Sequence, residues 1–126
     1  VLDIKSINTE LLFVTLDKSD KKFSPSTSYH DYAVNEWLFH WQTQNSARPD
    51  KGKGLEYVNH LALNKQVLLF IREKSKDEYG RTMGFVNIGP VKIDSYNGLK
   101  PMNITWQLHE PLPPHLWHDA AKLAVG

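Results

Sequence analysis

Large aromatic side chains occupy every second position from 37 to 41 of the chain, as Trp37, Phe39 and Trp41. In a β-strand, successive side chains point to opposite faces, so the three rings would line one side of a strand. The other side would carry Leu38, His40, Gln42 and Gln44. We expect the aromatic side to be buried, because Trp and Phe supply much of a small core. The polar side offers donors and acceptors suited to the edge of a base or another flat polar ligand.

Length and composition limit the class of protein. A chain of 126 residues is long enough for one domain with a single core. Cysteine is absent, which excludes a disulfide framework and a thiolate metal site and fits a cytoplasmic protein. No apolar run approaches the roughly 18 residues of a membrane span, and no signal-peptide pattern opens the chain. The chain begins at Val1 rather than Met, so we expect a domain cut from a longer polypeptide.

The charges are nearly balanced, with 15 Lys and Arg against 14 Asp and Glu and a formal net charge of +1. The chain as a whole is therefore not a strongly basic nucleic-acid binder. Basic residues nevertheless gather in two loops, where they either form a solvated surface or follow a phosphate backbone. The candidates for backbone contacts are Arg48, Lys51, Lys53, Arg72 and Arg81.

Four further segments have the pattern of strands. Residues 10–17 and 66–72 are apolar runs rich in strand formers and predict two buried strands. The run 82–93 contains Gly89-Pro90, which predicts a bulge or sharp bend. Residues 103–108 alternate, which predicts a strand with Ile104, Trp106 and Leu108 inward and the residues between them outward.

Short helices are expected between and after these strands. Apolar spacing predicts a helix over 55–63 that Asn64 could end. A single helical turn over 29–34 would place Tyr29 and Tyr32 on the same side. A closing helix after residues 111–114 would carry a stripe of Leu116, Ala120 and Leu123. The predicted fold is α+β, a compact barrel of five to six strands with two or three short flanking helices.

Catalytic and metal-binding motifs are largely missing. The chain has no glycine-rich phosphate loop, no H-E-x-x-H and no G-x-S-x-G. His115, His118 and Asp119 are metal ligands in principle, but exposed polar residues on a terminal helix are the better interpretation. A catalytic His40 or His60 with Asp31 stays open, although a structural or surface role is favoured for both histidines. We expect a binding domain without cofactor or metal, rather than an enzyme.

Six short runs carry a family resemblance over about positions 10–112. They are STSYHDY at 26–32, FHWQTQN at 39–45, YVNH at 57–60, LLFIRE at 68–73, GRTM at 80–83 and MNITW at 102–106. In this order they resemble an uncharacterised domain at the C-terminus of bacterial DEAD/DEAH-type helicases. Many of those proteins also carry a phospholipase-D-like nuclease, and the family is similar to modification-dependent restriction systems that cleave methylated DNA.

The resemblance implies a PUA-like β-barrel similar to the SET-and-RING-associated methylcytosine readers. It further implies recognition of 5-methylcytosine or 5-hydroxymethylcytosine in double-stranded DNA by base flipping. The partners it implies are the helicase and nuclease modules of the same polypeptide, in bacterial defence.

A flipped base sets requirements that particular residues could meet. Flipping costs a few kcal/mol, and each aromatic platform returns about 1–3 kcal/mol per stacked base. Asp31 is a suitable acceptor for a cytosine amino group, and Gln42 or Gln44 could serve O2 and N3. The base-pocket candidates are Tyr29, Asp31, Tyr32, Trp37, His40, Trp41, Gln42 and Gln44.

Two alternatives from other classes remain. In the first, the domain couples helicase and nuclease modules, and its exposed aromatics form a protein interface. In the second, it is a small PUA-like hydrolase acting on RNA, which is disfavoured because no nucleophile or metal set stands out.

Overall fold

The computed structural model describes residues 1–16 and 31–116, and within them seven strands form one sheet. The strands are β1 (Leu2–Ile4), β2 (Thr9–Thr15), β3 (Tyr32–Ala33), β4 (Leu38–Gln42), β5 (Gln66–Arg72), β6 (Val86–Asn97) and β7 (Asn103–Leu108). A single 3-10 turn, η1 (Lys5–Ile7), links β1 to β2, and one short helix, α1 (Gly52–Val58), precedes β5.

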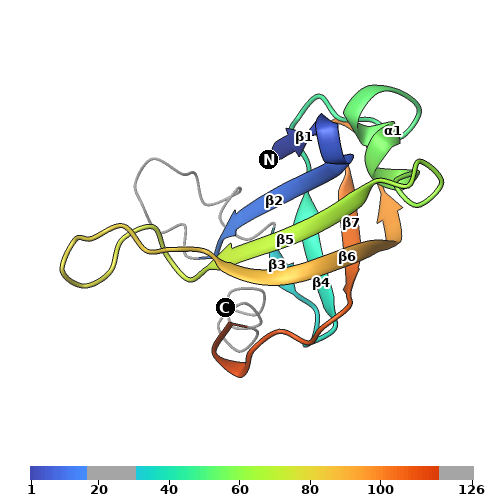
Figure 1. Cartoon of the computed structure of the whole chain (residues 1–126). Coiled ribbons are helices and arrows are strands. Elements are labelled where there is room, and N and C mark those ends of the chain that lie inside the picture. The colour runs from blue at the N-terminus through green and yellow to red at the C-terminus, as the bar shows by residue number, and fades with distance from the viewer. Residues whose placement is uncertain (17–30, 117–126) are drawn as a thin grey trace.

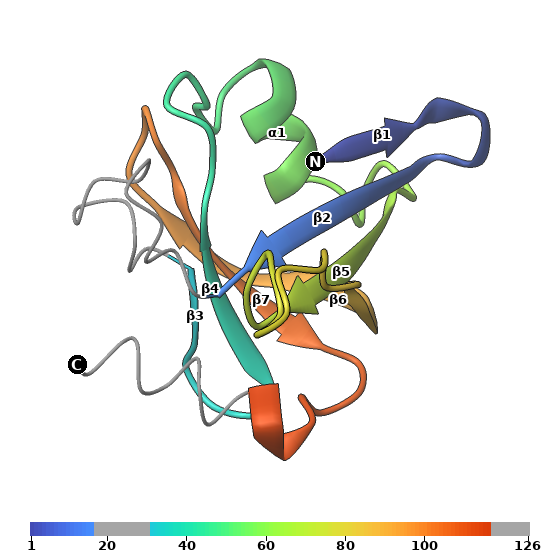
Figure 2. The same ribbon diagram turned by 90° about the vertical axis from the view of Figure 1, so that its left-hand side faces the viewer.

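The strand order is β1-β2-β5-β6-β7-β4-β3. The β2–β5 pair is parallel, whereas the other neighbouring pairs are antiparallel. Figure 1 shows the consequence: β2 and β5 cross in front of β4 and β7, so the sheet folds over on itself. Figure 2 shows α1 lying near one end of this folded sheet.

β6 makes the fold possible because it pairs with a different neighbour along each half. Residues 86–91 pair with β5, and residues 91–97 pair with β7. Register shifts in both ladders leave Ile88 and Asp94 as extra residues, and Gly89 has a φ of +100°. Such bulges bend a strand and increase its twist. The bend that Gly89-Pro90 predicted is therefore present.

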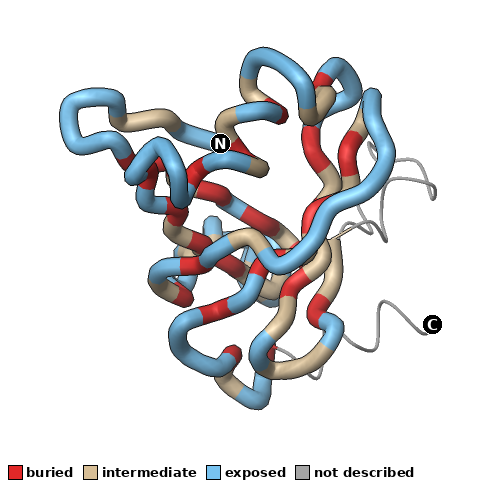
Figure 3. Tube along the Cα trace, turned by 90° about the vertical axis from the view of Figure 1, so that its right-hand side faces the viewer, coloured by how far each residue is buried: buried red, intermediate tan, exposed pale blue. Residues whose placement is uncertain are grey.

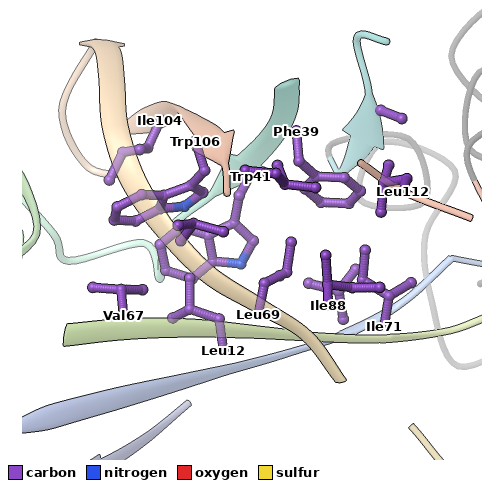
Figure 4. Close-up of a cluster of buried hydrophobic side chains, with 14 of the residues drawn as sticks. Leu12, Phe39, Trp41, Val67, Leu69, Ile71, Ile88, Ile104, Trp106 and Leu112 are labelled. Carbon is purple, nitrogen blue, oxygen red and sulfur yellow. The ribbon is translucent and has the colours of Figure 1, made fainter. Parts of the chain in front are cut away.

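The core fills the space between the two halves of the sheet. Trp106, Phe39 and Leu69 are fully buried, and they come from β7, β4 and β5. Figure 4 shows side chains of β2 and β5 below facing those of β4 and β7 above. Along the strands buried and more exposed residues alternate, as Figure 3 shows. This matches the predicted inward positions of 103–108 and of Phe39 and Trp41.

The predicted mixed α+β class is confirmed, but the closed barrel is wrong: the sheet is open. β1 and β3 stand at the two ends of the strand order and are only three and two residues long. A bend in one strand curves a sheet, whereas closure also needs the end strands to pair.

The helix predicted over 55–63 is shorter and earlier in the structure, as α1. Residues 59–64 are not helical because the His60 side chain lies in the core. There its ring forms hydrogen bonds with the backbone oxygen of Lys65 and the backbone N–H of Ile93. Asn64, with a φ of +53°, lies at the end of these turns.

The turn predicted over 29–34 is contradicted at Tyr32–Ala33, which form β3. Of the predicted closing helix, residues 114–116 are helical and Leu116 is buried, whereas Ala120 and Leu123 lie outside the described residues.

Strand predictions are more accurate. The segment 66–72 is β5 with the expected ends, and 103–108 is β7. The segment 10–17 corresponds to β2, which begins one residue earlier and ends two residues earlier. In the part of the chain that the structure describes, no helix is long and apolar enough to span a membrane.

Gly54 in α1 allows the loop before the helix to pack closely. A Cβ atom at this position would lie 2.1 Å from the backbone oxygen of Arg48 and 2.7 Å from Sδ of Met102. We predict that Gly54→Ala lowers the free energy of unfolding by about 1–3 kcal/mol, since the backbone cannot yield cheaply. Urea denaturation measures this, with Gly84→Ala as control because a Cβ there meets nothing within 4 Å. Equal stability of the two variants would contradict the close packing.

Candidate nucleic-acid interface

The outward side chains of β4, β7 and the second half of β6 form one continuous surface, here called the polar face. Gln107 of β7 pairs with Leu38 on one side and Lys92 on the other. The next row joins His40, Thr105 and Ser95 in the same way. A third row joins Gln42, Asn103 and Asn97. The alternation of each strand therefore places amide, hydroxyl and imidazole groups side by side on the surface.

Four predicted base-pocket residues meet on this face. The rings of Tyr32 and His40 stack on each other with centroids 4.5 Å apart and planes at 16°. Asp31 accepts a hydrogen bond at Oδ1 from the backbone N–H of Gln42, at 3.0 Å. The Gln42 amide donates to Oδ1 of Asn103 at 3.2 Å. Because Tyr32 and His40 already contact each other, no base fits between them without their separation.

Other predicted residues lie elsewhere. Trp41 is in the core, where its ring centroid is 5.2 Å from that of Tyr57 and 6.3 Å from that of Trp106. Gln44 is exposed beyond β4, and its backbone oxygen accepts from the side chain of the preceding threonine. Tyr29 lies outside the described residues. Trp41 thus belongs to the interlocked aromatic core.

Trp37 comes immediately before β4, and this residue is 46% exposed. The Asn35 side chain fixes its position, since Oδ1 accepts from the backbone N–H of Trp37 at 2.7 Å and of Leu38 at 3.0 Å. The Trp37 backbone oxygen in turn accepts from the N–H of Leu108 at 2.8 Å. The backbone of Trp37 is therefore held at the end of β7, and much of this residue is open to solvent.

Trp37 lines a surface cavity of about 490 Å³ at one end of the polar face, here called the hollow. This volume is in the range of small-ligand sites. Exposed residues at its rim are Trp37, Leu61, Gln66, Pro90, Lys92, Gln107 and His109. Buried residues at its floor are His60, Lys65, Val67, Val91 and Leu108. The hollow thus combines an exposed aromatic ring, two amides and a lysine with a largely aliphatic floor.

His60 is a structural part of the floor. Its Nε2 accepts a hydrogen bond from the backbone N–H of Ile93 at 3.0 Å, so Nδ1 carries the proton and donates to the Lys65 oxygen at 3.0 Å. Both ring nitrogens are therefore in use, and His60 is only 1% exposed. This confirms the structural role that the sequence favoured for His60.

Behind the hollow, a network of ion pairs joins β1, β2, α1 and the turn before β5. Lys65 Nζ lies 2.8 Å from Asp3 and 3.3 Å from Glu56. Lys53 Nζ lies 3.0 Å from Asp3 and 2.6 Å from the fully buried Glu10. Hydrogen bonds from Lys65 and Lys53 lower the pKa of Asp3 to about 2. Lys53 therefore stabilises the fold through its ion pairs with Asp3 and Glu10.

The remaining candidates for contacts with a phosphate backbone differ in whether other side chains of the fold already bind them. Arg48 and Arg81 each pair with an acidic side chain nearby in sequence. Arg72 donates to Thr15 Oγ1 at 2.9 Å and lies over a phenylalanine ring. Lys51 is exposed and, among the described residues, has no ion pair. Lys92 lines the hollow and was not among the predicted candidates. It too is exposed and has no ion pair among the described residues.

Sequence reasoning missed most of the rim. Gln107 was assigned outward, which was correct, and Trp37 was selected for its ring. Gln66, Lys92 and His109 carried no signal of their own, because only the register of β5, β6 and β7 brings them together.

Metal-ligating side chains do not cluster in residues 1–16 and 31–116: no group of three or more His, Cys, Asp or Glu is placed to hold an ion. His115 Nε2 lies 4.0 Å from a carboxylate oxygen of Glu73. His118 and Asp119 lie outside the described residues.

The Asp3 carboxylate should make stability depend on pH. Its pKa in the folded chain, about 2, is below the ordinary value of 3.8. Its charge therefore stabilises the fold fully above about pH 4, and this contribution is lost as the pH falls toward 2. We predict that the free energy of unfolding, measured with urea, falls less over this range in Asp3→Asn than in the wild type.

The control is Asp94→Asn, because Asp94 is exposed at the β6 bulge and has no ion pair among the described residues. It should keep the wild-type pH dependence. A parallel fall in the wild type and in Asp3→Asn would show that the network does not depend on this carboxylate.

Comparison with known proteins gives one finding. No curated protein matches the chain. A family model described as a domain of unknown function, DUF3427, matches residues 2–120. That match spans nearly all of the 126 residues, including every described strand. The chain belongs to the DUF3427 family.

Proposed function

We propose that this domain binds double-stranded DNA and recognises 5-methylcytosine or 5-hydroxymethylcytosine in it, by receiving a base flipped out of the duplex. The observation that carries the proposal is the polar face that ends in the hollow beside the half-exposed indole of Trp37. An exposed aromatic ring beside hydrogen-bonding side chains is what a flipped base needs from its site.

The energetics support this use of the hollow. Stacking on Trp37 would return about 1–3 kcal/mol, which offsets a large part of the cost of flipping. The carboxamides of Gln66 and Gln107 each offer both a donor and an acceptor to the edge of a base. The methyl group adds only about 0.8 kcal/mol, or about four-fold in affinity.

Electrostatics add a modest contribution. Lys92 and Lys51 are exposed and have no ion pairs among the described residues, whereas Lys53 and Arg72 are engaged within the fold. Each lysine that contacts a phosphate changes the slope of log K against log salt by about −0.9. We therefore expect a shallow salt dependence, and an affinity that rests on contacts with the base.

The resemblance to helicase-associated domains supplies the cellular setting of the proposal. In that setting the domain directs helicase and nuclease modules of the same polypeptide to modified DNA, in modification-dependent restriction. Its kinship with PUA-like readers is likewise part of the proposal; the folded-over open sheet around one core supports it.

A second candidate is a protein-interaction domain without base recognition. The observation in its favour is an aromatic group on the outer surface of β2 and β5. Phe13 stacks on Phe70 at 5.1 Å and contacts Phe85 edge-on at 5.2 Å, and Phe13 is 39% exposed. Exposed aromatic groups are common at protein interfaces.

A binding series separates the two candidates. Fluorescence anisotropy with labelled duplexes that differ only in one base, cytosine, 5-methylcytosine or 5-hydroxymethylcytosine, measures each affinity at 50 to 200 mM salt. We predict that at least one modified duplex binds about four-fold or more tightly than the unmodified duplex. Equal affinity for all three would contradict modification recognition, and binding to none at low salt would favour the protein-interaction domain.

A further inference from the structure

We infer that the hollow is the site of the flipped base and that its aliphatic floor selects 5-methylcytosine over 5-hydroxymethylcytosine. The inference rests on the proposed function and makes it more specific. It assigns the face of the base to Trp37, its polar edge to the rim amides, and its 5-substituent to the floor.

The floor is suited to a methyl group. Val67, Val91 and Leu108 line it from three adjacent strands, and each is less than 7% exposed. Their outermost methyl groups are the part of the floor that a ligand can contact. Burying one additional methyl group against such a surface strengthens binding about four-fold.

Among the described side chains of the floor, none has a polar group left to bond a hydroxyl group. His60 is the one polar ring of the floor, and both nitrogens already bond to backbone groups of Lys65 and Ile93. Nζ of Lys65 is turned to Asp3 and Glu56, so the stem of this side chain is what remains for the wall. A buried hydroxyl without a hydrogen bond weakens binding about five-fold or more.

The alternative base site, between Tyr32 and His40, is already closed by their mutual stacking at 4.5 Å. Trp37 has no such partner ring within the described part of the chain, and this residue is 46% exposed. The hollow therefore has an aromatic ring that is open to a base.

The first test compares Trp37→Ala with Tyr79→Ala in the full 126-residue chain. Tyr79 is a matched control because it is exposed, at 74%, and does not line the hollow. Trp37→Ala should bind the 5-methylcytosine duplex about five-fold to one-hundred-fold more weakly than the wild type, while Tyr79→Ala keeps wild-type affinity. Wild-type affinity in Trp37→Ala would overturn the assignment of the hollow.

The second test changes the chemistry of the floor without changing its shape. Val91→Thr replaces a methyl group by a hydroxyl group, which could bond the hydroxyl of 5-hydroxymethylcytosine. The ratio of the 5-methylcytosine to the 5-hydroxymethylcytosine affinity should be about five or more in the wild type and should fall several-fold in Val91→Thr. The control is Val14→Thr, a similarly buried position on β2 away from the hollow, which should keep the wild-type ratio.

Thermal unfolding of each variant checks that a change in the ratio does not come from loss of the fold. If the wild type prefers 5-hydroxymethylcytosine, or if the ratio is the same in Val91→Thr, this inference fails while modification recognition stands. If the wild type does not distinguish any modified duplex from the unmodified one, the proposed function itself fails.

Discussion

The bend of β6 is the constraint on which the other features depend. A single twelve-residue strand serves two partners, β5 along its first half and β7 along its second, and the bulges at Ile88 and Asp94 let it turn between them. Because of this turn, one sheet covers both sides of its own core. The same turn brings Lys92 beside Gln107 and so creates the rim of the hollow.

The ion-pair network is the second interaction that holds the fold, because it joins β1 and β2 to α1 and to the turn before β5. Fully buried Glu10 is held by Lys53, and removing one partner of such a pair leaves a buried charge without compensation. Burial and the nearby charge of Glu10 raise the pKa of the Tyr57 hydroxyl, so this side chain stays neutral in the core. The charges thus fix α1 and the turn at Lys65 against β1 and β2.

The strands were predictable from the sequence because alternation reports directly which face a side chain occupies. Phe39 and Trp41 are buried while His40 and Gln42 are not, as expected. Trp37 departs from that pattern because it precedes β4 and its position is set by hydrogen bonds to Asn35. The hollow was not predictable, since it depends on pairing between strands that the sequence does not specify. The open sheet and the short α1 were missed for the same reason: tertiary contacts decided them.

The parallel pairing of β2 with β5 has a consequence for how the chain folds. Thr9 lies opposite Gln66, so the 56 residues between them must be enclosed before this ladder can form. The pairing of β4 with β7 encloses a comparably long segment, as Leu38 lies opposite Gln107. Contacts between distant segments slow the search for the native topology, because the entropy of loop closure is lost before the contacts are gained. The antiparallel pairs of consecutive strands, β5–β6 and β6–β7 among them, are local, and they are the natural places for folding to begin.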